Sequence, residues 1–134
     1  MRPLILTILA AATIATAPSA SVARERLAPE DQLAKLLDGR IAGKPSDCIS
    51  LSTVSSSQVI DKTAIVYRSG STLWVNRPRG GAASLDDDDI LVTKLISSQL
   101  CSIDTVELRD RSSHMYSGFV SLGEFVPYRR AKAE

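Results

Sequence analysis

The chain has 134 residues, with 16 lysines and arginines against 15 acidic residues, two cysteines and one histidine. This length allows one ordinary domain. The balance of charge argues against a nucleic-acid-binding protein that works through a basic surface, and two cysteines with one histidine cannot by themselves supply the four ligands of a structural zinc site.

Residues 1–23 have the pattern of a secretory signal peptide. Arg2 adds a positive charge, a run of low polarity follows from Leu4 to Thr16, and small residues come next. We expect cleavage after Ala23; cleavage after Ala20 and an uncleaved amino-terminal anchor are the alternatives. Since the run is shorter than the roughly 20 apolar residues that span a bilayer, no transmembrane segment is expected in the mature chain. The expected location is the periplasm or the outside of the cell.

Residues 24–47 predict one helix followed by a loop. Pro29-Glu30-Asp31 is a helix-start pattern, because proline is accommodated in the first turn and acidic residues favour the positive end of a helix. Three leucines then form one apolar stripe, and Gly39 is a natural helix end; the stripe consists of Leu33, Leu36 and Leu37. Ile41 to Asp47 is expected to be a loop.

Residues 48–128 predict a β domain. Short runs rich in β-forming residues alternate with turn signals, at residues 48–54, 59–67, 72–76, 90–93, 104–109 and 116–122. Ser69-Gly70-Ser71 indicates a hairpin turn, and Gly118 indicates a bulge. Ser55 to Ser57 is expected to be a turn, with a flexible linker as the alternative. Residues 129–134 are expected to be a polar tail.

These elements predict a mainly β fold, in which a small antiparallel sheet is curled into a barrel or a sandwich. One N-terminal α-helix would cover a face or an open end of the sheet. The strand spacing has no room for a second long helix, which argues against parallel βαβ units.

Cys48 and Cys101 are expected to form a disulfide, because an exported protein meets an oxidising compartment. In the chain-entropy model, a bridge of this span stabilises the fold by roughly 4 kcal/mol. A redox-active pair is disfavoured because the sequence has no Cys-x-x-Cys arrangement. Free thiols and intermolecular pairing are the alternatives.

Four short motifs resemble those of a family of small exported proteobacterial proteins of unknown function. They are Cys48-Ile49, Val59-Ile60-Asp61, Leu100-Cys101-Ser102-Ile103-Asp104 and Leu122-Gly123-Glu124-Phe125-Val126-Pro127. The resemblance covers about residues 40–130. It implies neither an activity nor a site. Many members of that family carry two further cysteines, and this chain has none in the Arg77–Leu85 loop and Ser121 before Leu122. The resemblance therefore implies that a second disulfide is missing here.

The run Asp86-Asp87-Asp88-Asp89 is a candidate calcium site, since carboxylate oxygens are calcium ligands. The run lacks the alternating acids, the glycine and the final glutamate of an EF-hand loop. Adjacent residues of an extended chain also point to opposite faces. We therefore favour a solvated acidic loop over a metal site, and no cofactor is expected.

The single histidine, His114, lies near Ser112, Ser113 and Asp110, but neighbours on one turn rarely form a catalytic triad. It is expected to be a surface residue. Trp74 and Tyr67 are candidate binding residues, because exposed aromatic side chains stack on sugars or enter a partner's pocket; a packed tryptophan is the alternative.

Small basic clusters could contact an anionic envelope surface, but ordinary solvated charge is preferred because each is small. They consist of Arg77 and Arg79, and of Arg129, Arg130 and Lys132. The sequence as a whole favours a non-catalytic exported protein that binds a partner, such as an envelope protein, or has a structural role. An inhibitor-like module for an envelope enzyme and a hydrolase built on carboxylates are the alternatives.

Overall fold

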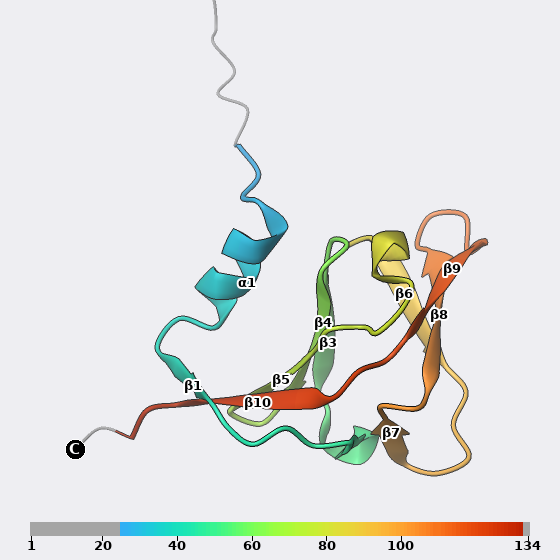
Figure 1. The fold of residues 1–134 in the computed structure, drawn as a ribbon. Helices are drawn as coiled ribbons and strands as arrows, with labels where there is room; N and C mark the ends of the chain where they lie inside the picture. The colour runs from blue at the N-terminus through green and yellow to red at the C-terminus, as the bar shows by residue number, and fades with distance from the viewer. Residues whose placement is uncertain (1–24, 133–134) are drawn as a thin grey trace, which may run out of the picture.

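The computed structural model describes residues 25–132, so the expected signal peptide and both of its cleavage points lie outside the described residues. The described chain is mainly β, with one α-helix and antiparallel sheets (Figure 1). No helix in this part of the chain is long and apolar enough to cross a membrane. The sequence-based prediction of a mainly β fold with one N-terminal helix is confirmed.

The largest sheet has five strands, all antiparallel to their neighbours. Their order across the sheet is β1 (Arg40–Ala42), β10 (Phe125–Arg130), β5 (Thr72–Asn76), β4 (Ala64–Ser69) and β3 (Ser56–Ile60). The hairpin predicted around Gly70 is the β4–β5 connection, where Gly70 has a φ of 57°. A positive φ costs glycine little, because it has no Cβ.

Two smaller sheets complete the β structure. A three-stranded sheet has the order β6 (Asp89–Thr93), β8 (Thr105–Asp110) and β9 (Tyr116–Ser121), and a two-stranded sheet pairs β2 (Cys48–Ser50) with β7 (Gln99–Cys101). The register shifts between β8 and β9 next to Gly118, which confirms the predicted bulge. Two short 3-10 helices follow β2 and precede β6, at Leu51–Thr53 and Ala82–Ser84.

The five-stranded sheet is buried on both of its faces. One face carries Ala64, Val66, Leu73 and Val75, which form an apolar cluster with Leu33 of α1 (Pro29–Leu36). The opposite face packs against the three-stranded sheet. This larger cluster includes Val59, Ile65, Tyr67 and Phe125 from one sheet and Val106, Leu108 and Val120 from the other. As the leucine stripe predicted, the helix covers one face of the sheet (Figure 1).

Cys48 and Cys101 form a disulfide, which confirms the pairing expected from the sequence. The two residues stand directly opposite each other in the β2–β7 ladder. Each of these strands has only three residues, so the covalent bond joins a ladder that has few hydrogen bonds of its own.

Several sequence-based expectations are wrong. Of the two predicted arrangements, the barrel is not formed, because the five-stranded sheet ends at β1 and β3 and the three-stranded sheet ends at β6 and β9. Ser56 and Ser57 belong to strand β3 and not to a turn, since pairing with β4 determines their conformation despite their polarity. The run expected from Cys48 to Val54 is a three-residue strand followed by a 3-10 helix.

The expected loop after the helix and the expected tail also contain strand. Arg40–Ala42 of β1 pairs with Tyr128–Arg130 of β10. Strand β10 therefore extends two residues into the segment expected to be a polar tail, and it includes Pro127. Long-range pairing holds these residues in place, and local composition does not reveal it.

Candidate functional site

Two edge strands face each other across an open gap on one side of the molecule. Strand β3 pairs only with β4, and strand β6 pairs only with β8. In an antiparallel ladder, alternate residues turn their backbone N–H and C=O groups away from the partner strand. We call this gap, bordered by β3 and β6, the β3–β6 seam.

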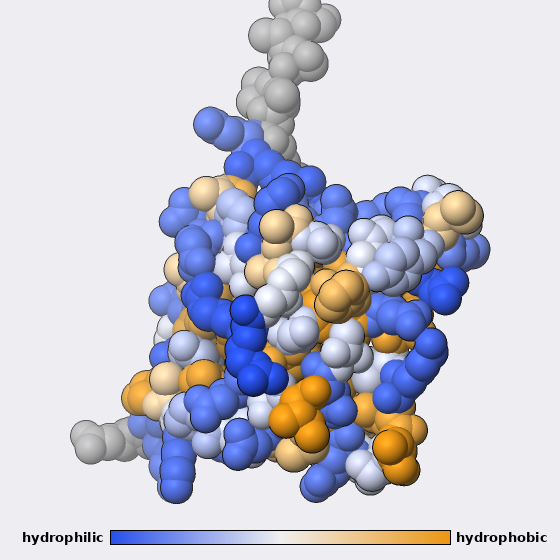
Figure 2. Space-filling model, turned by 45° about the vertical axis from the view of Figure 1, so that its right-hand side comes forward, coloured by the Kyte–Doolittle hydropathy of each residue, from blue (hydrophilic) through white to orange (hydrophobic). Residues whose placement is uncertain are grey.

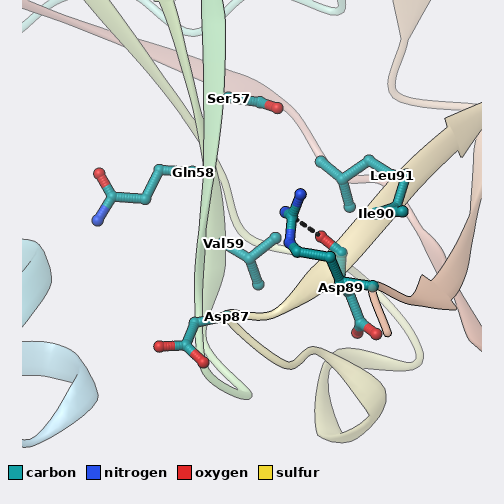
Figure 3. Close-up of a pocket in the computed structure, with 8 residues that line it drawn as sticks. Ser57, Gln58, Val59, Asp87, Asp89, Ile90 and Leu91 are labelled. Carbon is teal, nitrogen blue, oxygen red and sulfur yellow. Dashed lines mark hydrogen bonds between the residues drawn. The ribbon is translucent and has the colours of Figure 1, made fainter. Parts of the chain in front are cut away.

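Two cavities lie along the seam. One has a volume of about 330 Å³ and is lined by Ser57, Gln58, Val59, Asp87, Asp89, Ile90, Leu91 and Arg111. The other has a volume of about 290 Å³ and is lined by Leu51, Val54, Ser55, Ser56, Ser57, Tyr67, Leu91 and Thr93. Ser57 and Leu91 line both, which joins the two cavities into one groove. Figure 3 shows Ser57 and Val59 pointing from β3 toward β6, while Gln58 points away.

The two strands run in opposite directions along the seam. Val59 lies at the same cavity as Asp89, whereas Ser55 at the start of the groove lies at the same cavity as Thr93. The residue numbers therefore rise along β3 as they fall along β6. The two strands that border the groove are therefore antiparallel to each other.

One end of the seam is acidic. Asp87 is exposed and pairs with Arg26. Arg111 donates from Nε to Oδ1 of Asp88 at 3.2 Å and from Nη2 to the carbonyl of Asp89 at 3.4 Å. The Asp89 side chain is buried; its two oxygens accept hydrogen bonds from Ser117 Oγ at 2.9 Å and from the backbone N–H of Asp86 at 3.0 Å. Asp89 is therefore a structural carboxylate that fixes the start of β6.

The other end of the seam is apolar and contains an unpaired hydroxyl. Leu51, Val54 and Leu91 lie against the main core at this end. Tyr67 also lines this cavity, is 4% exposed, and has no hydrogen-bond partner for its hydroxyl within residues 25–132. Burial raises the pKa of the Tyr67 hydroxyl well above its ordinary value. An orphaned buried hydroxyl costs free energy until a partner group reaches it.

The acidic run does not act as one group. Carboxylate oxygens of Asp61, Asp86 and Asp87 lie within 4.8 Å of one another. This group includes Asp61 and leaves out Asp88 and Asp89, so it differs from the consecutive run in the sequence. Within this set, Asp61 accepts from the backbone N–H of Asp87 at 2.6 Å, and Arg26 pairs with Asp87. Asp88 and Asp89 turn to Arg111 and Ser117. The solvated acidic loop, favoured over a calcium site from the sequence, stays a prediction.

His114 is exposed on the turn after β8, with a φ of 58°. Ser112 and Ser113 donate to Asp110 Oδ1 through both their hydroxyls and their backbone N–H groups, at 2.6 to 3.0 Å. These bonds, with the Ser112 hydroxyl contributing most, lower the pKa of Asp110 to about 2. The carboxylate thus holds the turn together, and the two hydroxyls are directed to it and not to His114.

The aromatic and basic candidates lie at separate places. Trp74 is half-buried against the main core, and the guanidinium carbon of Arg129 lies 5.8 Å from its ring centroid, a cation–π distance. Tyr67 is buried between the sheets and is not an exposed aromatic. Arg77 pairs with Glu30 of the helix, and Arg79 donates to the carbonyls of Leu122 and Ser102.

The exposed apolar side chains of the described residues do not indicate a second binding surface. They are Leu27, Ile41, Ile96, Ile103, Met115, Tyr116 and Phe119. On the face shown in Figure 2, apolar side chains lie in separate groups among hydrophilic ones.

Sequence patterns did not indicate Ser57, Leu91 or Arg111 as binding residues. The only signal for them was a serine-rich segment beside a run of β-forming residues.

The fold and this geometry define a class of protein: a disulfide-linked, mainly β domain that is open along one side between two edge strands. No protein-family model matches the chain, and the comparisons with curated proteins and solved structures found no significant similarity. The resemblance to small exported proteobacterial proteins therefore stays a prediction.

Proposed function

We propose that the protein is a non-catalytic, exported binding domain and that the β3–β6 seam is its binding surface. Its two larger sheets form an incomplete sandwich, which a bound partner completes. The observation that carries the proposal is the groove itself, in which two unpaired strand edges border adjoining cavities of about 330 and 290 Å³. An exposed strand edge presents unpaired N–H and C=O groups and is usually blunted or covered. The open pair of edges therefore supports a bound partner at this place.

The disulfide and the lack of a membrane-spanning helix in the described residues are compatible with export. They support the assignment to the envelope or the secreted fraction, together with the signal-peptide pattern of residues 1–23. An inhibitor of an envelope enzyme is one form that such a binding domain could take.

The carboxyl groups add no support for a hydrolase. A carboxylate-based mechanism uses one acid with a raised pKa beside an ionised one. Among the described residues, the pKa values of Glu30, Glu107 and Asp110 depart from the ordinary value, and each is lowered. The main cause of the lowered pKa is a side-chain hydrogen bond, which comes from Arg77 to Glu30, from Lys94 to Glu107 and from Ser112 to Asp110.

Photo-crosslinking in the envelope of the producing cell tests this proposal. A photoreactive side chain replaces Ser57, where the two cavities meet, or Lys44, which follows β1 at the opposite edge of the large sheet. Both positions are exposed. We expect a discrete adduct from position 57 and none from position 44. Equal labelling from both positions, or no adduct from position 57, would contradict the proposal.

A further inference from the structure

The seam has the length of one short strand. Strands β3 and β6 each contain five residues, and the two cavities follow them from Ser55 to Val59 and from Asp89 to Thr93. At about 3.3 Å per residue, five or six extended residues would fill such a groove. The occupant that this shape fits is an extended peptide segment and not a compact ligand.

Side chains line the seam, and free backbone edges border it. Ser57 and Val59 point from β3 toward β6, so β3 turns one of its faces to the gap. The unpaired edges of β3 and β6 offer N–H and C=O groups at alternate residues along the opening, where an extended segment can hydrogen-bond to one of them. Because β3 and β6 run in opposite directions, such a segment is antiparallel to one strand and parallel to the other.

The side chains at the two ends of the seam differ in character. At one end, carboxylates outnumber the basic groups Arg26 and Arg111; these carboxylates belong to Asp61, Asp86, Asp87, Asp88 and Asp89. At the other end, Leu51, Val54 and Leu91 form an apolar wall. A complementary segment therefore carries a lysine or arginine at one end and an apolar side chain at the other.

The Tyr67 hydroxyl is an independent sign of a missing partner. Tyr67 lines the apolar end, is 4% exposed, and has no hydrogen-bond partner within the described residues. Buried hydroxyl groups are nearly always paired. A polar group of an inserted segment would supply the missing bond.

We propose that an extended segment of a partner protein, basic at one end and apolar at the other, lies along the β3–β6 seam between Ser57 and Leu91 and pairs with one of its free strand edges. This inference rests on the proposed function and specifies the partner of the same surface.

Selection from a library of random peptides tests the inference. The probe is a phage library of peptides of roughly 12 residues, about twice the length that the seam accommodates. The target is the full chain, expressed with its own amino-terminal segment and purified with the disulfide formed. Ser57→Trp fills the groove where the cavities meet, and Lys44→Trp is the matched control at the opposite edge. Circular dichroism and the melting temperature establish that both variants fold.

We expect enriched peptides that combine a basic residue with alternating apolar residues. They should bind Ser57→Trp at least about tenfold more weakly than Lys44→Trp. Asp87→Asn should weaken them about threefold at low salt, and Asp38→Asn, at the end of the helix, should leave the affinity unchanged. In amide NMR spectra of the wild-type chain, the shifts should change at β3 and β6.

Three results would overturn the inference. The first is that no peptide is enriched on the wild-type chain relative to Ser57→Trp. The second is that amide chemical shifts change only in strands other than β3 and β6. The third is that the chain self-associates and Ser57→Trp abolishes this association, which would assign the seam to a second copy. If the seam crosslinks in the envelope and yet no peptide is enriched, the seam binds something other than a strand. In that case the inference fails while the proposed function stands.

Discussion

At the residue scale, close contacts explain two of the short motifs in the sequence. The Asn76 side chain is fully buried; it donates to the Gly123 carbonyl at 2.7 Å and accepts from the Gly123 N–H at 3.0 Å. The Asp104 carboxylate accepts from the Cys101 N–H at 2.7 Å, which closes the turn after β7. Both motifs are therefore accounted for by folding, and neither identifies a binding residue.

Gly123→Ala should destabilise the fold. A Cβ at this position would lie 2.5 Å from the backbone oxygen of Arg77, so the β5 end or the loop must shift. We expect a loss of about 1–3 kcal/mol in the free energy of unfolding, measured by urea denaturation. Gly80→Ala is the control, since its Cβ would meet nothing closer than 3.9 Å. Equal midpoints for the two variants would disprove the argument.

Asp110 should titrate in the folded protein near pH 2, below its ordinary value of 3.8. The folded pKa is depressed, so this carboxylate contributes stability above pH 3.8, and that contribution is lost as the pH falls toward 2. Replacing Ser112 and Ser113 by alanine should raise the pKa of Asp110 and flatten the fall in melting temperature over this range. Carboxyl NMR titration checks the pKa; an unchanged value in the double variant would show that the hydroxyls are not its cause.

Tyr67→Phe should be neutral or stabilising in the free protein. The change removes a buried hydroxyl that lacks a partner within residues 25–132 and keeps the ring against Phe125. An unsatisfied buried group costs roughly 1–3 kcal/mol, so a gain of up to about 1 kcal/mol is expected in urea denaturation. A clear loss of stability would mean that the hydroxyl is already hydrogen-bonded in the free protein, for example to water.

At the element scale, the disulfide holds the small β2–β7 sheet. Cys48 and Cys101 are 53 positions apart in the chain and directly opposite in the ladder. Replacing both by alanine should lower the free energy of unfolding by about 2–4 kcal/mol, because the unfolded chain regains its freedom. The wild-type protein in reductant should show the same shift in the urea midpoint. An unchanged midpoint in both cases would contradict this role.

Elements with a strong local signal could be predicted, and short ones could not. Strands β5, β6, β8 and β9 follow runs of β-forming residues, and the leucine stripe marks α1. Strands β1 and β7 have three residues each, and β10 contains Pro127. Their conformation depends on partners far away in the chain, which a local pattern does not contain.

At the scale of the whole molecule, the candidate site is a missing pairing. The cysteine pair could be predicted from residue types and the exported context, but the seam could not. Ser57 and Leu91 lie 34 positions apart in the numbering, and they border one groove only because the two sheets end at β3 and β6. Four consecutive aspartates make the acidic run unusual in the sequence, yet in the structure their carboxylates contact different partners.

Amide hydrogen exchange along β3 and β6 tests the central claim most directly, because an unpaired edge exchanges fast and a paired one exchanges slowly. In the free protein, alternate amides of Ser56–Ile60 and Asp89–Thr93 should exchange much faster than those of the interior strands β4 and β8. They should become protected when the partner crosslinked through position 57 is bound. Full protection of both edges in the free protein, or protection by the partner at other strands only, would contradict the account.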